Sequence, residues 1–266
     1  LVSWVTSRLG RANPPTTNAE TNQISPPPFD RAAALLEQFR WSGQPKINLL
    51  LAGDAADLAS LKASLLLTVP AAISPWGNVT NVTLKIQPNR HIPGQTRPVT
   101  ELQLIADNAH IPPWGHGRNF KLLMEMTPTV TNRDLAEAEI TLSVAALTTV
   151  QGHADSMVFQ GRASVAWTNP VPSRAQGQMV LNGVETPWGR ARHATLALRY
   201  EPAPGRPTTP TDPLMAFPEI LDPLDLDFDA DIDGVESRGL RIERLQTSGQ
   251  WRSPKLEIKR LDVDLF

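Results

Sequence analysis

The sequence predicts a mainly β protein: an elongated antiparallel repeat sheet curled into a groove, preceded by one or two short N-terminal helices. A Pro-Trp-Gly motif recurs three times along the chain. Apolar and polar residues alternate with period two in most segments after residue 45, which is typical of strands with one apolar face. The motif recurs at a period of about 37 residues, in the range of repeat architectures, with two strands in each repeat.

Two short helices are expected in residues 1–44, a helical and Pro-rich segment. Leu1, Trp4, Val5 and Leu9 share one helical face, which predicts a short docked helix or, alternatively, a helix on a membrane surface. Residues 14–28 are rich in Pro, Thr, Asn and Ser and are expected to be extended. A second helix is expected to begin at Asp30, an N-cap residue type, and to pack over one end of the sheet.

The repeating β-hairpin sheet is expected over residues 45–202. Pro-Trp-Gly ends at Gly77, Gly115 and Gly189, so the steps are 38 and 74 residues, the second being two units of 37. A fourth copy should therefore lie near residue 150, where Val150-Gln151-Gly152 keeps only the glycine. Glycine adopts turn conformations that other residues resist, and proline cannot donate to a strand ladder. Each motif is therefore predicted to be a hairpin turn.

The three tryptophans of these turns are expected to cap the strand ends along one rim of the sheet. A ladder of ligand-contacting rings is the alternative. The residues concerned are Trp76, Trp114 and Trp188.

One face of the predicted strands carries medium-sized aliphatic side chains and few aromatic ones. Such a face suits lipid acyl chains, because apolar contact is non-directional and scales with area. The alternative is that this face is simply the core of a closed structure. The candidate groove-facing residues are Leu84, Ile86, Leu102, Leu104, Leu122, Met124, Met126, Ile140, Leu142, Leu196 and Leu198.

The repeat fades after residue 202. A Pro-rich insertion at 203–223 is expected to interrupt it, and truncated β repeats are expected to continue over 224–266. Within that region "DADIDG" imitates the start of a calcium-binding EF-hand loop. The twelfth position of such a loop should be a glutamate, but Leu240 stands there. A strand with aspartates on its outer face is the preferred interpretation.

No catalytic motif, cofactor fingerprint or metal-ligand spacing is present, so the protein is predicted to be non-enzymatic, without cofactor or metal. There are no cysteines, which excludes disulfides and thiolate sites. A net charge of −2 gives no indication of nucleic-acid binding. The chain begins at Leu1 and ends within an apparent strand, so we expect a piece of a longer protein whose membrane anchor is missing.

The strands running into "ISPWG", "IPPWG" and "ETPWG", the passage "LEQFRWSGQPKINLLLAGDAADLASLKASLLLTV" and the closing "QWRSPKLEIKRLDVDLF" resemble the AsmA-like family of Gram-negative bacteria. The resemblance covers residues 30–266. It implies a periplasmic, inner-membrane-anchored β-groove protein that binds or conducts phospholipid or another lipid in outer-membrane biogenesis. Its partners would be the inner or outer membrane or outer-membrane proteins. The alternatives are an assembly scaffold for outer-membrane proteins and a saccharide-binding β-solenoid.

Overall fold

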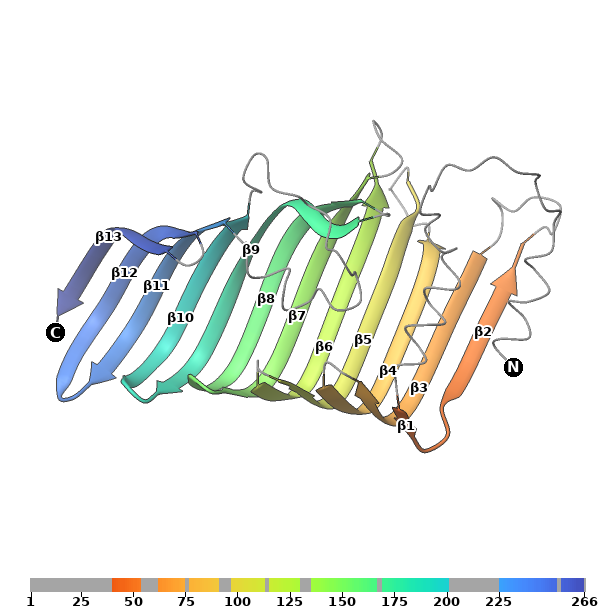
Figure 1. Cartoon of the computed structure of the whole chain (residues 1–266), viewed down its shortest axis with the longest axis horizontal. Helices are drawn as coiled ribbons and strands as arrows, with labels where there is room; N and C mark the ends of the chain where they lie inside the picture. The colour runs from red at the N-terminus through yellow and green to blue at the C-terminus, as the bar shows by residue number, and fades with distance from the viewer. Residues whose placement is uncertain are drawn as a thin grey trace, which may run out of the picture.

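The structure is a computed structural model that describes residues 40–53, 62–74, 77–90, 97–112, 115–129, 135–166, 169–200, 225–252 and 255–265. The two expected helices and the expected insertion at 203–223 lie outside these ranges. The described part is one long antiparallel sheet, whose strands lie side by side along the molecule (Figure 1). Its thirteen strands are β1 (Arg40–Ser42), β2 (Lys46–Ala52), β3 (Lys62–Ser74), β4 (Gly77–Arg90), β5 (Val99–Ile111), β6 (Gly115–Pro128), β7 (Leu135–Thr149), β8 (Gly152–Ala166), β9 (Asn169–Thr186), β10 (Gly189–Tyr200), β11 (Asp225–Ser237), β12 (Leu240–Arg252) and β13 (Lys255–Leu265).

The strands follow one another in chain order from β3 to β13, each antiparallel to the next. Extensive contacts between described strands join only hydrogen-bonded neighbours, so this part of the chain forms a single layer. The predicted mainly β repeat sheet is therefore confirmed. It begins earlier than expected, because Arg40–Ser42 already pairs with residues 71–73 of β3.

The outer edge of β3 is shared by two short strands. β2 pairs with residues 62–68 and β1 with residues 71–73, and Pro70 lies between the two paired stretches. Proline has no N–H to give to a ladder, so the partner strand is interrupted at this point. Gly43 crosses the gap with a φ of 83°, and a Cβ there would lie 3.0 Å from the Pro70 ring.

The glycine of each repeat lies against the backbone of the following hairpin. A Cβ added at Gly77, Gly115 or Gly152 would lie 2.0–2.1 Å from the carbonyl oxygen of the residue 33 positions later. The copy at Val150-Gln151-Gly152, which lacks the tryptophan, therefore makes the same contact as the others. This confirms the predicted fourth copy and gives the physical reason for glycine, because no side chain fits there.

The same turn is stabilised by a hydroxyl group on the residue that precedes it. The side chain donates to the carbonyl oxygen of the turn glycine, at 3.0–3.3 Å, in three of the turns. The donor and acceptor pairs are Ser74 and Gly77, Thr149 and Gly152, and Thr186 and Gly189.

Strands β11 to β13 continue the antiparallel sheet after residue 224. Gly189 lies against the carbonyl oxygen of Glu236, 47 residues later instead of 33. The residue after the glycine still pairs as in the preceding repeat, with Arg190 opposite Glu236 as His153 is opposite Glu185. The extra residues therefore change neither the register at the turn rim nor the face that each strand presents. Alternation alone could not show this, because it does not reveal which strands pair.

A row of residues with left-handed backbone crosses the sheet close to the turn rim. We call this row the crease; it consists of Asn81, Asn119, Ala146, Gly183 and Gly234, with φ values of 50–62°. A left-handed residue within a strand is typical of a β-bulge, which bends the strand. The strand ends beyond the crease accordingly curl out of the plane of the main sheet, along its lower edge in Figure 1.

The apolar face lies on the inside of this bend. Ala72 and Val79, on the turn side of the crease, pack with Val69, Val82 and Ala106 on the other side. Several inward-facing residues beyond the crease are small, and Ala72, Ala109 and Ala154 are only 3–7% exposed. Small side chains allow the two parts of the face to approach, so the apolar face is concave at the crease.

Candidate functional site

The strand register brings all eleven predicted groove residues onto one face of the sheet, hereafter the apolar face. They lie in three neighbouring rows that run across the strands. The first row is Leu67, Leu84, Leu104, Leu122, Leu142, Phe159, Met179, Leu196 and Ala230. The second row is Leu65, Ile86, Leu102, Met124, Ile140, Gly161, Gly177, Leu198 and Phe228. The third row contains Met126, Ala138, Ala163, Ala175 and Tyr200.

The large side chains of this face are only half-buried. Each of the eleven predicted residues falls between the buried and the exposed class, whereas the fully buried apolar residues are valines and alanines. In a closed sandwich the large aliphatic side chains at the middle of the sheet would be the most buried. Within the described residues the apolar face is therefore an accessible concave surface.

Two aromatic rings that the sequence analysis did not single out complete the apolar face. Gly161 and Gly177 lie next to each other in the second row, and a Cβ on either would come within 2.6–2.9 Å of the ring of Phe159. The ring thus covers the surface that the glycines leave bare. Phe228 covers Gly249 in the same way on β11 and β12. Met157 and Phe159, two positions apart in a strand-like run, were the signal in the sequence that could have found this contact.

The opposite face is polar, and near the crease its charges are paired. Arg244 donates from Nε to Asp231 Oδ1 at 2.8 Å, and Gln246 donates to Oδ2 at 3.2 Å. These bonds lower the pKa of Asp231 to about 2. The hydrogen bond from Arg190 likewise lowers the pKa of Glu236. The "DADIDG" segment is thus part of strand β11 with carboxylates on the polar face, as predicted.

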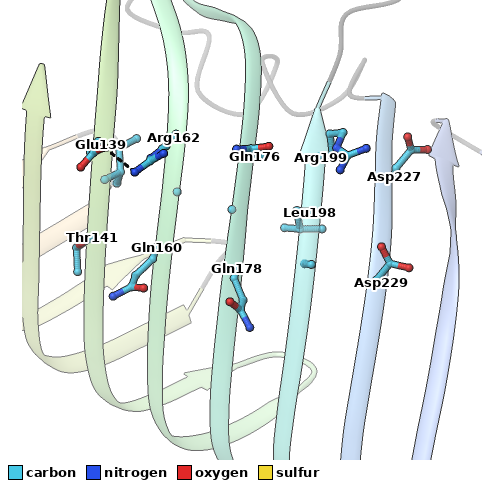
Figure 2. A pocket seen from close by; sticks show the side chains of 14 residues that line it. Glu139, Thr141, Gln160, Arg162, Gln176, Gln178, Leu198, Arg199, Asp227 and Asp229 are labelled. Atoms are coloured by element: carbon cyan, nitrogen blue, oxygen red, sulfur yellow. Dashed lines mark ion pairs between the residues drawn. The ribbon is translucent and has the colours of Figure 1, made fainter. Parts of the chain in front are cut away.

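The middle of the polar face carries a hollow of about 630 Å³ (Figure 2). Side chains from five adjacent strands, β7 to β11, line it, and ten of these residues are labelled in the figure. Glu139 and Arg162 form an ion pair at 3.0 Å across β7 and β8. The sequence analysis missed this hollow, because its residues are brought together only by the register.

Of the three motif tryptophans, Trp188 is the one that lies within the described residues. Trp188 lies at the tip of its turn and is 65% exposed, so it does not cap the strand ends. Its backbone N–H donates to Thr186 Oγ1 at 3.3 Å and its carbonyl oxygen accepts from Ser237 Oγ. Trp76 and Trp114 lie outside the described residues.

Two histidines of the described strands, His153 and His193, take part in local polar contacts. His153 Nδ1 lies 3.0 Å from Thr148 Oγ1, and His193 Nδ1 lies 2.9 Å from Asn182 Oδ1. No group of three or more potential metal ligands occurs among the described residues. In the same part of the chain, no helix has the length and apolar composition needed to cross a membrane.

No protein-family model matches the chain, and no match was found among the curated proteins or the solved structures.

Proposed function

We propose that this protein binds the acyl chains of membrane lipids on the concave apolar face of its sheet and provides a path along which they pass. The observation that carries the proposal is the continuity of the face. Apolar residues stand directly opposite one another in the register from β3 to β11, and the large ones remain half-exposed. Binding would be driven by the removal of apolar surface from water. Each buried methylene group contributes about 0.8 kcal/mol of favourable free energy.

The width of the apolar face supports full-length lipid chains as the ligand. Along β6, Phe120, Leu122, Met124 and Met126 share the face, so the apolar band spans six residue steps. At about 3.4 Å per residue this is about 20 Å. One leaflet of a bilayer has a hydrocarbon depth of about 15 Å, half of the usual core. A membrane-lipid chain lying parallel to the strands would therefore fit within the band.

The cellular setting is part of the same proposal. The resemblance to the AsmA-like family supports a periplasmic protein, anchored in the inner membrane, that acts in outer-membrane biogenesis. The lipid would then be a phospholipid or another lipid of the envelope, and no covalent chemistry by the protein is required.

Adjacent residues of one strand provide a sharp test. Leu122 lies on the apolar face, and Leu123, its neighbour in sequence, lies on the polar face and is 37% exposed. Lipids bound after purification from a Gram-negative host would be identified by native mass spectrometry. We expect Leu122→Asp to remove them and Leu123→Asp to keep them, with circular dichroism unchanged in both. Unfolding of Leu122→Asp alone, or equal lipid content in both variants, would contradict the proposal.

A second function, assembly of client strands at a sheet edge, is favoured by β13. Among the described residues this strand pairs only with β12, and its apolar side chains are 43–62% exposed. An exposed edge of this kind can accept a further strand. Lys259→Pro should then abolish crosslinking of partner proteins while leaving lipid content unchanged, and unaltered crosslinking would exclude this function.

A further inference from the structure

The polar face carries a hydrogen-bonding surface that the binding of acyl chains does not use. The hollow of about 630 Å³ adjoins two others, of about 420 and 290 Å³. It shares Arg162, Gln176 and Arg199 with the first of these, and Ala197 and Asp229 with the second. Together the three form an elongated band across β7 to β13, a shape that suits an extended ligand.

The side chains of the central hollow alternate in chemistry across the strands. One row of the register runs Glu139, Arg162, Gln176, Arg199 and Asp227. The next row contains Thr141, Gln160, Gln178, Ala197 and Asp229. Ala197 is much shorter than its neighbours in that row and leaves the space between Gln178 and Asp229 open.

Most of these groups have no partner among the residues that the structure describes. The pair of Glu139 and Arg162 is the one contact found among the described lining residues, although Arg199 and Asp227 stand directly opposite each other. The same face near the crease is different, because Arg190 and Arg244 are bonded there to carboxylates. The glutamines of the hollow, Gln160, Gln176 and Gln178, point into it with both amide donors and acceptors available (Figure 2).

The charges of the hollow indicate the class of ligand. Three carboxylates and two guanidinium groups line it, so neither an anion nor a cation meets a surface of opposite charge. No aromatic side chain lines it, which disfavours flat apolar ligands. Hydroxyl groups both donate and accept, and thus match amides, carboxylates and guanidinium groups together. Such groups recur with each strand, every 4.7–4.9 Å, as a polymer of similar units requires.

We propose that this band binds a linear, uncharged oligosaccharide lying across strands β7 to β13, on the face opposite the acyl-chain surface. Recognition rests on hydrogen bonds alone, so a dissociation constant on the order of 1 mM is expected. The proposal is independent of lipid binding, since the groups that would bind the sugar are the polar side chains of the opposite face, although Ile140 and Leu198 of the apolar rows also line the central hollow. It is also independent of the tryptophans at the turn rim.

The test is a titration of the isotopically labelled chain with maltohexaose, cellohexaose and chitohexaose, followed by NMR. At about 10 mM of at least one of them, we expect the side-chain amide signals of Gln160, Gln176 and Gln178 to shift. Gln103 lies in the same row as Gln160 but outside the hollow, and its signal should stay in place. Gln178→Ala should weaken binding about fivefold, the loss of one hydrogen bond, and Gln103→Ala should not.

Three outcomes would overturn the proposal. The first is that none of the three sugars moves the glutamine signals. The second is that shifts centre on Trp188, which would locate saccharide binding at the turn rim. The third is that inorganic phosphate moves the Arg162 and Arg199 signals while the sugars do not, which would make the hollow an anion site.

Discussion

Replacing a turn glycine tests whether the repeat is held by close backbone contact. In Gly152→Ala the new Cβ would lie 2.1 Å from Glu185 O, where ordinary contact begins at 3.4 Å. The contacting atom belongs to the backbone of β9, so relief requires β8 and β9 to separate by more than 1 Å at the rim. Their hydrogen bonds around the His153 and Glu185 pair would then be lost.

The cost can be estimated from these parts. Two backbone hydrogen bonds contribute about 1 kcal/mol each, and a positive φ costs alanine about 1 kcal/mol more than glycine. Gly152→Ala should therefore destabilise the sheet by about 3 kcal/mol. Gly239 is the matched control, because its φ is +84° but nothing lies within 4 Å of a Cβ there. Gly239→Ala should cost about 1 kcal/mol, from the backbone conformation alone.

The measurement should resolve individual hairpins, since repeat sheets need not unfold in one step. Native-state hydrogen exchange of the β8 and β9 amides would give the local free energy of opening. Urea unfolding, followed by circular dichroism, would give the global free energy of unfolding. We expect Gly152→Ala to lower protection in β8 and β9 by about 2 kcal/mol more than Gly239→Ala lowers it in β11 and β12. Equal losses in the two variants would refute the role assigned to the glycine–carbonyl contact.

Two further predictions concern the two faces of the sheet. Asp231 has a pKa of about 2 in the folded chain, against 3.8 ordinarily, so its stabilising effect is present above pH 4 and is lost between about pH 4 and 2. Asp231→Asn should make the free energy of unfolding depend less on pH in this range. The effect should be slight, because the pair with Arg244 is solvent-exposed. Urea titrations that show the same pH dependence in the variant and the parent chain would count against the pair. Phe159→Ala should lower stability by about 2 kcal/mol, less than for a fully buried ring, and Phe159→Leu by less, as measured by thermal unfolding. A loss below 0.5 kcal/mol in Phe159→Ala would mean that the ring does not cover Gly161 and Gly177.

The sequence was sufficient to predict the strands and the composition of the apolar face. Both are local properties: alternation assigns Leu122, Met124 and Met126 to one face, and the recurring glycine sets the positions of the turns. Register then follows from short hairpins, which explains why predicted residues from separate strands fall into common rows.

The crease could not be predicted, because its backbone conformation has no single residue signature. Asn81 and Gly183 are residue types that adopt the left-handed region, but Ala146 is not, and nothing around it signals a bulge. Beyond the crease the alternation changes phase, so simple alternation would have assigned Ala72 and Ala109 to the wrong face. The polar hollow was missed for a related reason, since Gln160 and Gln178 become neighbours only through pairing of β8 with β9.

The recurrence of tryptophan and the construction of the turn are separate matters. The turn ending at Gly152 has no tryptophan, yet its glycine contact and its threonine hydrogen bond match those of the turn ending at Gly189. Trp188, which is present in the second of these turns, is exposed and packs little of its ring. The glycine and the preceding hydroxyl are therefore sufficient to form the hairpin, and the ring is not needed to hold the rim together. The exposed ring of Trp188 therefore lies at the rim, apart from the acyl-chain surface, where it can contact a ligand outside the sheet.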